Sequence, residues 1–264
     1  MPPAMATYLD RIVAAHRSTA MLDERAVGPL ASAAAAMQPA RGFRARLAAD
    51  SHQHLAVISE IKRRSPSKGD LNARLDPAAL AGCYEHGGAS CLSVLTDVDH
   101  FGGSVTDLQA ARGATALPVI RKDFTVSEAD ICDTRLMGAD CVLLIAAALE
   151  RDELVRFHAL AVAIGLDVLV EIHDEHELDV ALAAGATMVG VNQRDLVTFE
   201  VDHDRAVRMA GVIPNDIVKI AESGVRGPAD ARSLRAAGYD AVLVGESLVT
   251  AADPSAALAA LCVR

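Results

Sequence analysis

The stretch that decides the fold reads Val57-Ile58-Ser59-Glu60-Ile61-Lys62-Arg63-Arg64-Ser65-Pro66-Ser67. On a β-strand, Glu60 and Lys62 point to the same face as Ile58, because side chains alternate with a period of two. A carboxylate and an ammonium on a buried face are costly unless they are paired or used. The Ser-Pro-Ser turn that follows ends the strand and starts a loop. Parallel α/β proteins place active sites where strands end in loops, so this stretch predicts a strand with a functional C-terminal end.

Working outward from this strand, similar apolar runs recur at intervals of 21 to 35 residues. Most are nearly continuous in Val, Ile and Leu, which is typical of parallel strands covered on both faces. The eight predicted strands are Ala56–Lys62, Cys91–Thr96, Pro118–Asp123, Cys141–Ala147, Asp167–Ile172, Met188–Asn192, Val218–Ser223 and Ala241–Glu246.

Helix patterns lie between these runs, with Asp-Pro or Pro starts and Gly after several of their ends. The clearest are Pro77–His86, Glu150–Ile164, Glu175–Ala184, Pro228–Ala237 and Pro254–Leu261. Eight βα units predict an α/β fold of the (β/α)8, or TIM-barrel, type. A doubly wound sheet is the competing fold, but it more often has five to seven strands.

Residues 1–50 precede the eight units and read as an N-terminal helical extension that packs against the barrel or caps one end. Its expected helices are Met5–Arg17, Leu30–Met37 and Phe43–Ala49. We find no linker-like segment, and we therefore expect residues 1–264 to form a single domain.

The composition narrows the class of protein. The net charge of −10 argues against nucleic acid or an anionic membrane as the main partner. Five irregularly spaced cysteines indicate reduced thiols in a cytoplasmic protein. The first 17 residues do not resemble a signal peptide, and no apolar run is long enough for a membrane helix.

Polar groups collect at one end of nearly every predicted strand. By strand parity, Lys122 shares a face with Ile120, and Glu171 shares one with Leu169. A Lys and a Glu that meet at one barrel mouth can act as general acid and general base. The alternative is that Lys122 only forms a structural ion pair with Glu60 or Glu171.

Two further patterns concern ligands. Ala221–Val225 and Val244–Ser247 place glycines after the last two strands, where barrels often bind phosphate, although each could be only a tight turn. The spacing of Glu171, His173 and His176 could suggest a metal site. However, His176 falls in the following predicted helix and no third well-spaced ligand appears, so we expect no metal.

Across the eight predicted strands, the chain resembles the indole-3-glycerol-phosphate synthases, which are tryptophan-pathway enzymes. The motif from Glu60 to Ser67 is the most specific part of the resemblance. The other matching segments are Ser93–Thr96, Phe101–Ser104, Arg121–Phe124, Leu169–His173, Gly190–Leu196, Ala221–Val225 and Val244–Leu248.

The resemblance implies a lyase that needs no cofactor. It would close the ring of 1-(2-carboxyphenylamino)-1-deoxyribulose 5-phosphate with loss of carbon dioxide and water. Lys122 would be the general acid and Glu171 the acid/base of the dehydration. Glu60 would support this charge arrangement and is a candidate to share the base role, while Lys62 would contact the substrate carboxylate and help ring closure.

The resemblance also implies substrate-binding residues. Asn192 and Arg194 would orient the anthranilate end, and Glu222 would reach the substrate from the seventh strand. The residues expected to bind the phosphate are Ser223, Gly224, Gly245 and Glu246, the last through its backbone N–H. The residues expected to pack against the aromatic ring are Pro66, Phe101 and Phe124. Ser65 is expected to form a hydrogen bond with the ligand. Some relatives carry Ser at position 246, so the Glu246 carboxylate must point away from a bound phosphate.

Two rival interpretations remain. Another phosphate-sugar barrel, such as phosphoribosylanthranilate isomerase or a tryptophan synthase α-like lyase, does not fit the Glu-x-Lys-x-x-Ser-Pro-Ser motif. A non-catalytic barrel would have lost at least one catalytic side chain, and none is missing. We expect a small anionic substrate and a monomer or weak homodimer, with other tryptophan-pathway enzymes as candidate partners.

Overall fold

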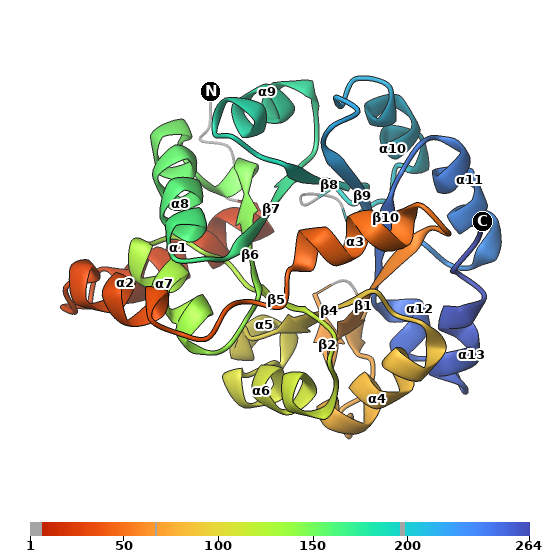
Figure 1. Cartoon of the computed structure of the whole chain (residues 1–264), viewed down its shortest axis with the longest axis horizontal. Helices are drawn as coiled ribbons and strands as arrows, with labels where there is room; N and C mark the ends of the chain where they lie inside the picture. Colours follow the sequence, from red (N-terminus) through yellow and green to blue (C-terminus); the bar gives the residue numbers. More distant parts are fainter. Residues whose placement is uncertain (1–6, 67, 196–198) are drawn as a thin grey trace.

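The computed structural model describes residues 7–66, 68–195 and 199–264. Eight parallel strands close into a barrel in the order β1-β10-β9-β8-β7-β6-β5-β4 (Figure 1). This confirms the predicted (β/α)8 barrel. The barrel strands are β1 (Ala56–Ile61), β4 (Cys91–Leu95), β5 (Val119–Lys122), β6 (Cys141–Ile145), β7 (Asp167–Ile172), β8 (Met188–Asn192), β9 (Val218–Glu222) and β10 (Ala241–Val244), and a separate hairpin joins β2 (Arg64–Ser65) to β3 (Gly69–Asp70).

Helices surround the barrel (Figure 1). Asp76 caps the first of them, because its side chain accepts hydrogen bonds from the N–H groups of Ala78 and Ala79, as its sequence position predicts. The helices are α4 (Pro77–Gly87), α5 (Val98–Phe101), α6 (Val105–Ala114), α7 (Glu128–Leu136), η1 (Ala146–Ala148, a 3₁₀ turn), α8 (Arg151–Ala163), α9 (Glu175–Ala183), α10 (His203–Ala210), α11 (Pro228–Ala236), α12 (Glu246–Val249) and α13 (Pro254–Ala259).

Six of the eight strands end one or two residues earlier than predicted. Ala146 starts a 3₁₀ turn, and Glu246 starts α12 rather than ending β10. These residues lie where the chain leaves the hydrogen-bonded ladder and turns toward the next helix. The apolar pattern alone does not show that point.

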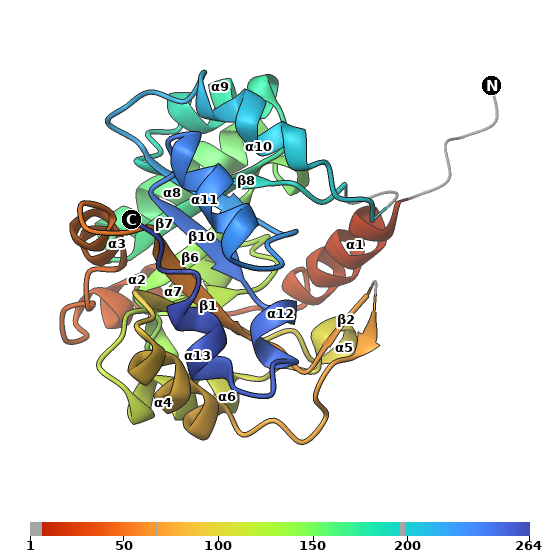
Figure 2. The same cartoon turned by 90° about the vertical axis from the view of Figure 1, so that its right-hand side faces the viewer.

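The N-terminal extension holds three helices: α1 (Tyr8–Ala20), α2 (Val27–Ala35) and α3 (Phe43–Ser51). Met5 and Ala6, at the start of the first predicted helix, lie outside the described residues. Helices α1 and α3 lie at opposite ends of the barrel, and α2 packs beside α7 (Figures 1 and 2). The extension therefore both packs against the barrel and covers its two ends.

The barrel interior is apolar toward the amino-terminal ends of the strands and charged at their carboxyl-terminal ends. Phe43 and Leu47 of α3 are fully buried and join a cluster formed by inward-facing side chains of the strands. Ile58, Ile120, Leu169 and Ile220 belong to this cluster. Two residues further along the same strands stand Glu60, Lys122, Glu171 and Glu222, which strand parity places on the same face at the carboxyl-terminal mouth.

Candidate active site

A cavity of about 490 Å³ opens at the carboxyl-terminal mouth of the barrel. All fifteen residues that the sequence assigned to the site line it. They are Glu60, Lys62, Ser65, Pro66, Phe101, Lys122, Phe124, Glu171, Asn192, Arg194, Glu222, Ser223, Gly224, Gly245 and Glu246. Ser67, which lies in the same loop motif, is outside the described residues.

Glu60 and Lys62, the pair that opened the sequence analysis, form a direct ion pair. Lys62 Nζ donates to Glu60 Oε1 in a short contact. The Glu60 side chain is 6% exposed and that of Lys62 is 15% exposed, so Glu60 lies deeper in the barrel. The pairing offsets part of the cost of burying both charges.

Lys122 stands among carboxyl groups from other strands. Its Nζ donates to Glu171 Oε2 at 3.1 Å and lies 3.7 Å from Glu222 Oε2. The second oxygen of Glu171 accepts a hydrogen bond of 2.9 Å from Asn192 Nδ2. Strands β5, β7, β8 and β9 thus each contribute one side chain to a single buried network.

The electrostatics of this network fix its charges. Burial opposes the charge of Lys122, but the carboxylates of Glu171, Glu222 and Glu60 outweigh it and raise the pKa of the ammonium. Burial also opposes the charge of Glu171, and Lys122 and His173 reverse that effect and lower the pKa of this carboxyl. Lys122 and Glu171 are therefore a charged pair at neutral pH.

Glu222 behaves differently from Glu171. Burial, followed by the neighbouring charge of Glu171, raises the pKa of Glu222 to about 8. Its Oε1 has no hydrogen-bond partner among the described residues. Glu60, Glu171 and Glu222 face two ammonium groups, Lys62 and Lys122, so protonation of Glu222 removes the one unbalanced charge.

Two glycines make room for these carboxyl groups. A Cβ on Gly190 would overlap Glu222 Oε1 and lie 3.0 Å from its Cδ. A Cβ on Gly245 would lie 2.5 Å from Glu60 Oε1. The close approach of β8 and of the turn after β10 to the acidic side chains therefore requires glycine at both positions.

The loops after β9 and β10 form one side of the cavity. Ser223 and Gly224 both have positive φ angles, 66° and 76°, and a positive φ is uncommon for serine. Ser247 Oγ donates to the carbonyl oxygen of Val225 at 3.0 Å, which ties the two loops together. Glu246 is partly exposed, and its carboxylate lies 4.0 Å from Lys68 Nζ.

Apolar side chains and the guanidinium of Arg194 also line the cavity. The rings of Phe101 and Phe124 are tilted against each other, with centroids 6.3 Å apart. Arg194 donates to the carbonyl oxygen of Phe199 at 2.9 Å, and its own N–H bonds Asn192 Oδ1. Ser65 Oγ is buried without a hydrogen-bond partner among the described residues, so a bound ligand could supply one.

The sequence analysis missed the roof of the cavity. Tyr8, Leu9 and Ile12 of α1 line it from above. The rule that strand ends carry function does not reach a helix that lies some 40 residues before the first strand. A Tyr and an amphipathic pattern in that helix were the available signals, and neither specifies this end of the barrel.

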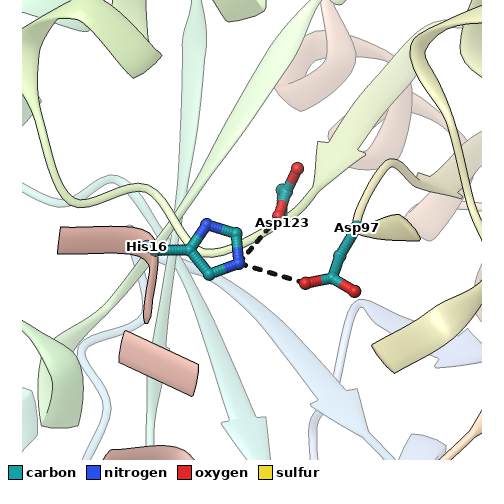
Figure 3. A group of neighbouring side chains, drawn as sticks. All are labelled: His16, Asp97 and Asp123. Carbon is teal, nitrogen blue, oxygen red and sulfur yellow. Dashed lines mark hydrogen bonds and ion pairs between the residues drawn. The ribbon is translucent and has the colours of Figure 1, made fainter. Parts of the chain in front are cut away.

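A second polar group that the sequence analysis missed lies beneath the same helix. His16 of α1 approaches Asp97 and Asp123, with Nε2 3.0 Å from Asp97 Oδ2 and 4.0 Å from Asp123 Oδ1 (Figure 3). One ligand atom from each of the three side chains lies within 4.8 Å of the others, which is close enough for a metal site. However, Arg121 bonds Asp123 at 2.9 Å, and its positive charge opposes a cation, so the trio is better explained as an anchor for α1.

Of the three metal ligands considered in the sequence, Glu171 and His173 lie close together, with 3.9 Å between Oε1 and Nε2, but His176 does not join them. His173 turns its Nδ1 to Glu177 Oε2 at 3.1 Å, and His176 is exposed on α9.

Within the described ranges, no helix has both the length and the apolar character needed to cross a bilayer.

Comparisons with known proteins agree with this geometry. A family model described as indole-3-glycerol phosphate synthase matches residues 9–261. An indole-3-glycerol phosphate synthase of Mycobacteroides abscessus is 48% identical over 255 residues, covering 97% of this chain and 93% of the relative. Indole-3-glycerol phosphate synthase 2 of Streptomyces coelicolor is 50% identical over 237 residues, covering 90% and 91%.

Among solved structures, the thiamine phosphate pyrophosphorylase from Pyrococcus furiosus superposes with a TM-score of 0.59 at 15% identity, covering 80% of this chain and 95% of that one. A 3-hexulose-6-phosphate synthase gives a TM-score of 0.59 at 17% identity, covering 78% and 98%. These likenesses show the barrel fold alone. The family model and the relatives show more: this chain belongs to the indole-3-glycerol phosphate synthase family.

Proposed function

We propose that the chain is a carboxy-lyase that converts 1-(2-carboxyphenylamino)-1-deoxyribulose 5-phosphate into indole-3-glycerol phosphate, carbon dioxide and water, as a step of tryptophan biosynthesis. The observation that carries the proposal is the pair of Lys122 Nζ and Glu171 Oε2, which lie 3.1 Å apart in a cavity that is also lined by Lys62, Glu60 and Glu222. An acid and a base in contact are what a combined ring closure and dehydration needs.

Lys122 supplies the proton in this proposal. Its raised pKa keeps it charged, so it can protonate the ketone oxygen while the aromatic carbon that bears the carboxylate attacks the carbonyl carbon. After carbon dioxide leaves, the same oxygen departs as water. Glu171, held ionised beside Lys122, takes the proton from the carbon next to the ring nitrogen.

The two ends of the substrate require opposite surroundings. Lys62 contacts the carboxylate and exchanges part of its pairing with Glu60 for the substrate, while Arg194 and Asn192 orient the anthranilate ring. Phe101 and Phe124, with Pro66, supply the apolar wall against which that ring packs.

The phosphate occupies the turns after β9 and β10. Ser223, Gly224 and the Gly245–Glu246 turn offer backbone N–H groups to the phosphate. Lys68 adds a positive charge nearby, and its ammonium lies 4.0 Å from the Glu246 carboxylate. A crystal soaked with sulfate tests this subsite. An anion bound only elsewhere would count against it.

The central test is the gain of indole fluorescence when purified protein meets freshly made substrate. We expect product formation with the protein and none with buffer. Absence of signal from protein whose folding is verified by circular dichroism would overturn the proposed function.

We further propose a cytoplasmic protein that acts as a single domain and as a monomer or weak homodimer. All five cysteines are unpaired, which supports a reducing compartment. Sedimentation of the purified chain at several concentrations tests the assembly.

A further inference from the structure

His173 stands directly behind the catalytic carboxylate and outside the substrate cavity. It follows β7, and its Nε2 lies 3.9 Å from Glu171 Oε1. It does not line the cavity that Glu171 lines. Its Nε2 is buried and has no hydrogen-bond partner within the part of the chain that the structure describes.

The other ring nitrogen is held in place. Glu177, in the first turn of α9, accepts hydrogen bonds from the backbone N–H of His173 at 2.7 Å and from its Nδ1 at 3.1 Å. A carboxylate on Nδ1 fixes both the orientation and the protonation of the imidazole and directs Nε2 at Glu171. The side chains of Glu171, His173 and Glu177 are 2%, 14% and 18% exposed, so the three form a graded path from the buried site toward solvent.

The proposed reaction takes up one proton in every turnover. The ketone oxygen leaves as water and needs two protons, and the substrate carbon next to nitrogen returns only one. The electron pair of the lost carboxylate stays in the new ring. The buried acid, Lys122, must therefore be reprotonated from solvent, while the bound substrate fills the cavity on the other side of Glu171.

We propose that His173 reprotonates the active site by passing a proton from the solvent side, at Glu177, to the carboxyl group of Glu171. The inference rests on the proposed function. In the step itself, the Nε2–H bond of the imidazolium breaks and an O–H bond forms on Glu171 Oε1. Rotation of that carboxyl then presents the proton to the amine of Lys122, 3.1 Å from Oε2, and water on the side of Glu177 reprotonates the imidazole. The 3.9 Å gap must close by about 1 Å for this transfer.

The charges around His173 favour a group that can carry the proton. Burial disfavours the imidazolium, but the hydrogen bond that it donates to Glu177 and the charges of Glu171 and Glu177 outweigh burial and raise the pKa of His173, with Arg205 of α10 acting in the opposite direction. Glu171, Glu177 and Arg205 are the charged groups that face the ring from β7, α9 and α10.

The test compares His173→Gln with the wild type and with His176→Gln, a matched control three residues further along the chain, at an exposed position of α9. We expect kcat of the His173→Gln variant to fall by about 10-fold or more, with KM changed by less than about 2-fold, because the relay acts on proton supply rather than on substrate binding. The alkaline side of the kcat–pH profile should fall at lower pH in this variant. His176→Gln should match the wild type.

Rescue separates proton transfer from a structural role. In His173→Ala, added imidazole should raise kcat in proportion to its concentration, while an equal concentration of an uncharged, non-titrating solute should not. Thermal unfolding shows which variants are folded, and His173→Asn replaces any that is not. Wild-type activity together with unchanged kcat in folded His173→Gln, or a loss that imidazole leaves untouched, would overturn the relay alone. An inactive wild type would overturn the proposed function itself.

Discussion

Lys122 Nζ and Glu171 Oε2 lie 3.1 Å apart although their strands, β5 and β7, are not neighbours in the barrel. Strand β6 lies between them and ends in Ile145, which also lines the cavity. The ion pair therefore lies across the end of β6, and both of its side chains line the cavity. A structural ion pair was the alternative interpretation of Lys122, and a variant can separate the two.

Lys122→Ala should keep substrate binding and lose turnover. We expect kcat to fall by roughly 10² to 10⁴, which is the usual contribution of a general acid. Fluorescence turnover and equilibrium binding of the product measure the two effects separately. Near-normal kcat would contradict the acid role, and parallel loss of binding and turnover would indicate a mainly structural one.

The raised pKa of Glu222 has a consequence for stability. Its carboxyl ionises near pH 4.5 in the unfolded chain and near 8 in the folded one, so the folded state binds more protons between these values. The free energy of unfolding therefore falls as the pH rises from about 4.5 to 8. Glu171, whose pKa is lowered, changes the free energy of unfolding with pH only below this window. Lys122, whose pKa is raised, changes it only above the window.

Glu222→Gln should flatten this pH dependence. The amide cannot ionise. The fall of about 5 kcal/mol in the free energy of unfolding, which a pKa shift of this size represents between pH 4.5 and 8, should therefore be absent from the variant. Urea unfolding at several pH values measures it. Glu175→Gln, at an exposed position of α9, is the matched control and should leave the slope unchanged. An equal slope in the Glu222→Gln variant would show that Glu222 ionises normally.

Much of this site was predictable because strand parity is a local property. Glu60, Lys122 and Glu171 lie two residues beyond apolar side chains of the barrel interior, and the eight-fold repeat places them at one end. The protonation of Glu222 was not predictable, because it depends on the distances between side chains of different strands. The roof formed by Tyr8 and its neighbours depends on the path of the N-terminal extension, for which the sequence has no repeat to follow.

Gly190 has a role that its sequence position did not reveal. The sequence analysis treated it only as part of a matching motif, whereas the structure shows that a methyl group there would meet the Glu222 carboxyl and Leu169 Cδ1, the latter at 3.2 Å. Gly190→Ala should lower the free energy of unfolding by about 1–3 kcal/mol, the usual cost of overpacking. It should also lower kcat, because the displaced carboxyl lies 3.7 Å from Lys122.

A double variant tests the cause of this loss. Glu222→Asp shortens the side chain by one methylene, so combining it with Gly190→Ala should restore part of the lost stability in a double-mutant cycle. Gly82→Ala is the control, since Gly82 lies inside α4 with open space around its Cα and the change should be neutral or stabilising. Additive losses in the cycle would mean that Gly190 and Glu222 do not interact.

The anchor of α1 should make substrate affinity depend on pH. The hydrogen bond that the His16 ring donates to the Asp97 carboxylate raises the pKa of His16. A raised histidine pKa contributes docking energy that is complete below pH 6.5 and is lost as the pH rises through the folded-state pKa. Because Tyr8 and Ile12 of the same helix form the roof of the cavity, KM should increase as the pH rises above neutrality.

His16→Gln should remove this dependence without unfolding the helix. Arg17 still holds α1 through its hydrogen bonds to Glu153, at 2.8 and 2.7 Å. The His16 side chain is 25% exposed, so we expect only about 0.5–1 kcal/mol, or a 2- to 5-fold higher KM at pH 6.5. KM measured from pH 6 to 9 should then be nearly flat, while the control His52→Gln, at an exposed position after α3, keeps the wild-type slope. A KM slope that persists in the His16→Gln variant would assign the pH dependence to another group.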